Sequence, residues 1–274
     1  MALSWQQAAV LTAVLAALAV VLTLGLIPRV AGLAAFAREA TLIAGLYALW
    51  QLAGELSVVG TAGAYARGEW LERTERTLHL PSEVDLQKAF LGHDWLIHAA
   101  NIYYATMHFG VLFVFLIWLF VRHRDRYPKM RRVLALTTLV CLVIQLLPVA
   151  PPRLLPQFGY QDTAARMGES VYSLGFGADS LSAMPSVHVA WAVLIAWAVY
   201  HLGAGIGRWL GIVHAVLTAF VVVVTANHFW ADGIVAVAVL LVCALVEDAV
   251  SRVVERVRIS REPEPVLAEA TASS

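Results

Sequence analysis

Long apolar runs separated by short polar segments are the dominant pattern of this 274-residue chain. A helix needs about 20 apolar residues to cross roughly 30 Å of hydrocarbon. Seven runs approach that length, near residues 8–27, 39–59, 95–121, 133–147, 185–202, 209–226 and 229–246. The pattern therefore predicts an all-α protein, a polytopic membrane bundle of about six to seven transmembrane helices.

Three segments depart from this pattern. Residues 61–94 mix leucines with charges, which predicts one or two short amphipathic helices outside the membrane. Residues 148–184 form a long loop rich in proline, glycine and polar residues, and long loops often carry function. Residues 260–274 are expected to be a disordered tail. Residues 1–259, with the first two of these segments included, are expected to form one integral membrane catalytic domain.

Composition excludes several classes of protein. Hydrophobic residues make up 60% and charged residues 14%, against roughly 45–50% and about 25% in soluble domains. A soluble domain, a disordered chain and a nucleic-acid-binding protein are therefore not expected. The net charge is zero, so it provides no long-range attraction to a charged partner. Cys141 and Cys243 both lie in apolar runs, which argues against a disulfide framework or a cysteine metal site.

Basic residues predict the orientation in the membrane. Residues 122–132 contain six Lys or Arg residues and should face the cytoplasm. With seven spans, thirteen basic residues then lie on the cytoplasmic side and six outside. This arrangement predicts a multi-pass protein of the cell membrane with a cytoplasmic C-terminus. No Lys or Arg precedes the first apolar run, so we expect that run to be retained rather than cleaved as a signal peptide.

Polar residues gather at the predicted outer ends of the last four spans, in residues 149–163, 182–190 and 225–233. Ionisable groups at membrane depth are costly, so each is a candidate for function. Because all three segments are predicted on the outer face, their convergence is the main functional signal. It predicts an active site on the extracytoplasmic side.

The segment 182–190 suits phosphate binding at the start of a helix. Pro185 is suited to the first helical turn because it has no N–H to leave unpaired. Free backbone N–H groups there attract anions, and the Ser186 hydroxyl adds a donor. His188, in the same turn, is placed to protonate a leaving oxygen. A histidine that merely caps the helix at the interface is the alternative.

His228 and Asp232 are four residues apart, which places them on one face of a helix. A carboxylate beside an imidazole fixes its tautomer and stabilises its cation, as a histidine nucleophile or base requires. A metal site or a simple ion pair are the alternatives, but no HExxH motif or further ligands accompany the pair. Arg153, after two prolines, either binds phosphate or snorkels to the interface. Together these residues indicate phosphoryl transfer without metal or cofactor.

The three segments resemble the signature motifs of the type 2 phosphatidic acid phosphatase superfamily. The matching residues are Arg153 for the first motif, Pro185, Ser186 and His188 for the second, and His228 and Asp232 for the third. Val187 replaces the glycine of the second motif. The strings APPR, AMPSVH and NHFWAD are closer to the branch of inositol phosphorylceramide synthases and their bacterial relatives, which are inositolphosphotransferase-like.

The resemblance implies a phosphatidic acid phosphatase-like core and a metal-independent lipid phosphotransferase or phosphatase. His228 would attack phosphorus, Asp232 would hold its ring, and His188 would protonate the leaving oxygen, which gives a phosphohistidine intermediate. The implied partners are the bilayer and a lipid phosphate or phospholipid substrate, with no nucleic acid. A plain phosphatase of polyprenyl phosphate or phosphatidic acid is the alternative within enzymes.

Two departures from the family motifs affect the phosphate site. Leu146 and Val222 stand where the family has a lysine and an arginine. Asn227 and Arg166, or a basic residue of the outer segment (Arg67, Arg73, Arg76 or Lys88), are therefore expected to join Arg153 and Ser186 in binding phosphate. A transporter and a catalytically silent scaffold remain as alternatives outside enzymes. A transporter typically shows repeats and polar sites near the bilayer midplane, and the sequence has no evident repeat.

Overall fold

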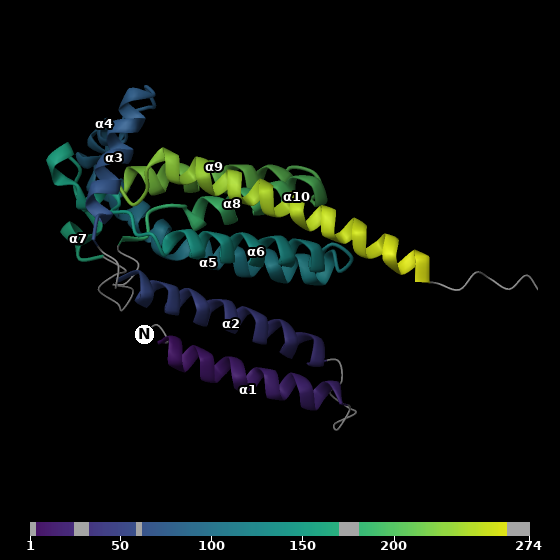
Figure 1. The fold of residues 1–274 in the computed structure, drawn as a ribbon. Coiled ribbons are helices and arrows are strands. Elements are labelled where there is room, and N and C mark those ends of the chain that lie inside the picture. The colour runs from purple at the N-terminus through teal and green to yellow at the C-terminus, as the bar shows by residue number, and fades with distance from the viewer. Residues whose placement is uncertain (1–3, 25–32, 59–61, 170–180, 262–274) are drawn as a thin grey trace, which may run out of the picture.

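The computed structural model describes residues 4–24, 33–58, 62–169 and 181–261, and these residues are largely helical (Figure 1). The long helices are α1 (Trp5–Thr23), α2 (Leu33–Val58), α5 (Asp94–Arg122), α6 (Tyr127–Gln145), α8 (Val187–Leu202), α9 (Gly207–Val224) and α10 (Trp230–Arg261). The short ones are α3 (Ala64–Thr77), α4 (Glu83–Leu91), α7 (Thr163–Met167) and the 3₁₀ turns η2 (Pro152–Leu154) and η3 (Pro156–Phe158). The all-α prediction is confirmed for this part of the chain.

Among the described residues, four helices are long and apolar enough to cross a membrane, which supports a membrane protein. They are α1, α5, α9 and the part Trp230–Arg258 of α10. Helix α8 is apolar but has only 16 residues. Each of the seven predicted spans coincides with a helix, yet the count of six to seven transmembrane helices is not confirmed. Helix α6, for example, begins with a basic segment that lowers its mean hydropathy.

The long helices lie side by side, and α3, α4 and α7 gather at one end of them (Figure 1). At this end α8 and α10 begin and α6 and α9 finish, and we call it the site end. Helix α1 packs on α2, and the two form an outer layer of the bundle (Figure 1). The 61–94 segment, predicted to lie outside the spans, thus forms two helices across the site end.

Two apolar clusters hold these elements together. The larger joins α5, α6, α8 and α10 through buried side chains that include Leu119, Val133, Ile195 and Leu240. Between helices in a lipid bilayer such side chains stabilise the bundle by van der Waals packing. The second cluster packs Leu71 of α3, Val84 of α4, Leu155 and Phe229 at the site end. It fixes α3 and α4 against the loops that carry the candidate residues.

Helix α3 approaches the 149–155 segment closely at Gly68. A Cβ atom there would lie 2.5 Å from the Ala150 carbonyl oxygen and 3.2 Å from Leu155 Cδ1. We expect Gly68→Ala to lower the free energy of unfolding by about 1–3 kcal/mol, because a packed backbone must shift. Thermal unfolding of the detergent-purified protein measures this loss. Gly92→Ala is the control, since its added Cβ meets no heavy atom within 4 Å; equal unfolding temperatures for the two variants would contradict the expectation.

Candidate active site

Backbone hydrogen bonds bring the three polar segments together at the site end. The Val149 N–H donates to Leu181 O at 2.7 Å, and the Arg153 N–H donates to Ala226 O at 2.8 Å. The Ser186 N–H donates to Asp232 O at 3.1 Å. Each segment is therefore bonded to another through main-chain groups, which keeps their side chains in a defined relation. The geometry agrees with the expected convergence.

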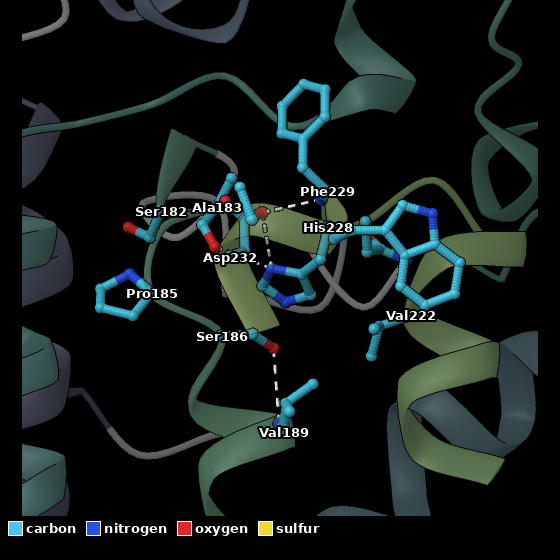
Figure 2. Close-up of polar contacts among 12 residues, drawn as sticks. Ser182, Ala183, Pro185, Ser186, Val189, Val222, His228, Phe229 and Asp232 are labelled. Carbon is cyan, nitrogen blue, oxygen red and sulfur yellow. Dashed lines mark hydrogen bonds and ion pairs between the residues drawn. The ribbon is translucent and has the colours of Figure 1, made fainter. Parts of the chain in front are cut away.

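His228 lies in the turn between α9 and α10. The turn is built by Ala226, whose φ is +53°, and by Val222 O, which accepts the N–H groups of Asn227 and His228. His228 Nδ1 lies 2.7 Å from Ala183 O and 3.3 Å from Asp232 Oδ2 (Figure 2). Both neighbours are acceptors, so we assign the proton to Nδ1, which leaves the lone pair on Nε2. Nε2 is buried and has no hydrogen-bond partner within the described part of the chain.

Asp232 is fully buried in the first turn of α10. Its Oδ2 also accepts the Phe229 N–H at 2.8 Å (Figure 2). His228 precedes α10, so the predicted shared helix face is wrong. The pair meets instead because the turn folds the imidazole back over the carboxylate, which caps the same turn.

His188, the second residue of α8, is the other imidazole of the site. Its ring centroid lies 5.7 Å from that of His228. The Tyr104 ring of α5 stacks on the His188 ring with a centroid distance of 4.6 Å, and the His108 ring centroid lies 4.2 Å from that of His188. His188 Nε2 is buried without a hydrogen-bond partner among the described residues. A small pocket lined by Tyr104, His108 and His188 extends from this point between α5, α8 and α9.

Ser186 is the N-cap of α8 and is fully buried. Its Oγ accepts the Val189 N–H at 3.4 Å (Figure 2). Pro185 stands before this cap, so its predicted place in the first helical turn is wrong. The start of α8 nevertheless lies beside the His228–Asp232 pair, through the bond between Ser186 and Asp232.

The remaining predicted phosphate ligands divide into two groups. Arg153, in η2, is buried and lies next to the His228 turn through its bond to Ala226. Its Nε is 3.8 Å from Asp162 Oδ2. Asn227 is also buried, and its Nδ2 donates to Thr225 Oγ1 at 2.9 Å. Both remain candidates for phosphate binding.

Arg166 lies elsewhere. It sits on α7, with its side chain 42% exposed, and pairs with Asp94 at 2.8 Å. Asp94 begins α5, ten residues before Tyr104, which corresponds to roughly 15 Å along a helix. The structure thus does not bring Arg166 to the histidines. Its part in phosphate binding stays a prediction, because Asp94 holds the Arg166 side chain at the N-terminal end of α5.

Two further carboxylates at the site were not predicted. Glu75 and Glu83 are buried and accept the N–H groups of Ala231 and Trp230 at the start of α10. Burial, together with the neighbouring Glu83 carboxyl, raises the pKa of Glu75 to about 9. In the sequence, Glu75 lies one helical turn after Leu71, on the apolar face of α3, which is a signal of burial.

The fold and site define a helical membrane protein with a buried His–Asp pair and a second histidine beside it. The model of the PAP2 superfamily matches residues 69–246, from α3 into α10. The chain therefore belongs to the PAP2 superfamily. Comparisons with curated proteins and with solved structures gave no match. Membership in the superfamily supports a lipid enzyme of the phosphatase or phosphotransferase type.

Proposed function

We propose that this protein transfers a phosphoryl or phosphodiester head group from a lipid to an alcohol acceptor, in the manner of an inositolphosphotransferase. The observation that carries the proposal is the environment of His228. Its Nδ1 lies between Ala183 O and Asp232 Oδ2, so its Nε2 is available as a nucleophile next to His188. The motif strings of the first and third segments support the inositolphosphotransferase-like branch.

The proposed reaction has two steps. His228 Nε2 attacks phosphorus while the bond from phosphorus to the lipid oxygen breaks, and His188 gives its proton to that oxygen. The product is a phosphohistidine, in which Asp232 stabilises the charge on the ring. An acceptor hydroxyl then attacks phosphorus, His188 takes its proton, and the bond to His228 breaks. The enzyme returns to its starting protonation state.

Charge on the phosphoryl oxygens also needs stabilisation. Arg153 and the N-terminus of α8 are the proposed sources, and Asn227 adds an amide near the turn. Positive groups aimed at developing charge are often the largest contribution to catalysis. The proposal includes no metal or other cofactor. The part of the chain that the structure describes contains no group of three or more His, Cys, Asp or Glu residues placed to bind an ion.

We propose that the site faces the extracytoplasmic side of the cell membrane. The basic segment 122–132 joins α5 to α6 at the end of the bundle opposite the site end (Figure 1). If that segment lies in the cytoplasm, as its charge indicates, the site end lies outside. The proposed substrates are then lipids of the outer leaflet.

The choice between transferase and phosphatase is tested by supplying an acceptor. Purified protein is incubated with phosphatidic acid, a polyprenyl phosphate or phosphatidylinositol in detergent micelles, with EDTA present throughout. Each substrate is assayed with and without an added lipid alcohol. Head-group transfer from phosphatidylinositol to the alcohol supports the proposal. Release of inorganic phosphate alone identifies a phosphatase, and absence of any turnover contradicts both and favours a transporter or scaffold.

Replacement of His188 tests its role as general acid. We expect His188→Ala to lower turnover of an alkyl phosphate lipid by about 10²-fold, because the leaving alkoxide then goes unprotonated. Turnover of p-nitrophenyl phosphate, whose leaving group needs no proton, should fall much less. His201→Ala is the control, because His201 lies at the other end of α8 and its Nδ1 bonds to Trp197 O of its own helix. Equal losses for both substrates would contradict the assignment.

A further inference from the structure

The start of α10 is held by carboxylates from outside the helix. The first N–H groups of a helix have no partner within it, and they form the positive end of its dipole. Here Trp230 N donates to Glu83 Oε1 at 3.2 Å, and Ala231 N donates to Glu75 Oε1 at 2.5 Å. The preceding N–H, of Phe229, donates to Asp232 Oδ2. Three successive N–H groups are thus each bound by a carboxyl group.

Glu75 and Glu83 reach α10 from the corner between α3 and α4. They are 3% and 4% exposed, although carboxyl groups are costly to bury without partners. The indole N–H of Trp230 donates to Pro81 O at 2.9 Å in the same corner. Residues of α3, of α4 and of the segment between them therefore bind the same helical turn that carries Asp232, the carboxylate that contacts His228.

The surroundings of Glu75 are acidic. Glu83 and Asp232 face it, and Tyr160, bonded to Glu72 at 2.6 Å, lies in the same cluster. Arg76 of α3 contributes a positive charge to this cluster through its ion pair with Glu72. Glu75 and Glu83 are buried and bind successive N–H groups of α10, so their carboxyls lie close together, and two such carboxyls do not readily ionise together. This agrees with the raised pKa of Glu75, whose largest cause is burial and whose next causes are both due to Glu83.

We propose that Glu75 and Glu83 are positioning residues that share one proton and fix the first turn of α10, so that Asp232 holds His228 in its reactive orientation. This inference rests on the proposed function. A second negative charge in the pair would repel Asp232 and loosen the turn. The consequence is a site that is assembled while Glu75 is protonated and loses its geometry as that proton leaves.

Glu75→Gln and Glu75→Ala separate the proposal from a simple loss of packing. Glutamine keeps the acceptor for Ala231 N and stays neutral, so turnover of phosphatidic acid in micelles should remain within about threefold of wild type at pH 7. The wild-type rate should show an additional fall as pH passes about 9, beyond any decline that it shares with Glu75→Gln. Glu75→Ala should lower kcat by about 10²-fold with KM nearly unchanged, because the substrate still binds but the nucleophile is misplaced.

A second measurement needs no turnover. The folded-state pKa of Glu75 is raised, so its stabilising effect is present below the unfolded pKa and is lost as pH rises through about 9. The unfolding temperature of wild type should therefore fall more steeply between about pH 5 and pH 9 than that of Glu75→Gln. Glu69→Gln is the matched control on α3, because Glu69 pairs with Arg73 at the surface.

The outcomes distinguish this inference from the proposed function. Two results overturn the positioning role. One is a Glu75→Ala protein with the wild-type kcat, and the other is a Glu75→Gln rate that falls above about pH 9 as much as the wild-type rate does. If Glu75→Ala does not fold, the pH profile of Glu75→Gln decides. If wild type turns over no lipid phosphate, the proposed function fails, and the unfolding slopes still decide whether the pair shares a proton. If the unfolding temperatures of wild type and Glu75→Gln fall equally with pH, the shared proton is overturned.

Discussion

Replacing His228 with glutamine should abolish turnover, with a rate loss of about 10⁴-fold or more. The side-chain amide can still donate to Ala183 O, so the turn should keep its structure. It offers no nucleophilic nitrogen, and the covalent step cannot occur. The measurement is the rate of phosphate release or head-group transfer from a saturating lipid substrate in micelles.

His93→Gln is the control for this substitution. His93 is exposed and precedes α5 at the same end of the bundle. It should retain the wild-type rate. A His228→Gln protein that folds and keeps more than a tenth of the wild-type rate would show that another group attacks phosphorus.

Replacing Asp232 with asparagine should lower kcat by about 10³-fold, which is less than the loss of about 10⁴ seen when the carboxylate of a serine-protease triad is removed. The difference has a structural reason. Ala183 O still accepts from His228 Nδ1 and favours the reactive tautomer. What is lost is the negative charge that stabilises the cationic ring of the intermediate.

Asp248→Asn on the same helix is the control. Asp248 pairs with Lys129 at the opposite end of the bundle, and its side chain is 37% exposed. Circular dichroism of both variants should match wild type. In Asp232→Asn the side-chain oxygen can still accept the Phe229 N–H, and Asp248 lies at the surface. A rate within tenfold of wild type for Asp232→Asn would mean that Ala183 O alone orients and stabilises the imidazole.

Much of the site could be predicted because it depends on residue type and membrane topology. Costly polar groups at one level of successive apolar helices indicated where His188, His228 and Asp232 would meet. Arg153 followed from its place in the loop between two spans. The motif spacing added the expected chemistry, and the superfamily match over residues 69–246 agrees with it.

The remaining features depend on contacts between distant segments. Glu83 and Trp230 are 147 positions apart, and the helical periodicity of either segment contains no information about the other. Arg166 was expected at the site because a cation was missing there, but its partner Asp94 holds it at the N-terminal end of α5, roughly 15 Å along the helix from Tyr104. His228 and Asp232 meet through a turn with a left-handed residue at Ala226, which the spacing of four residues does not reveal.

The central claim is covalent transfer through His228, and trapping the intermediate tests it most directly. Wild-type protein is mixed with phosphatidic acid labelled with ³²P and quenched in alkali, where a phosphohistidine survives. Peptide mass spectrometry should then locate one phosphoryl group on His228, and a chase with an alcohol acceptor should remove it. Label on another residue, or turnover with no labelled protein under conditions that preserve phosphohistidine, would contradict the mechanism.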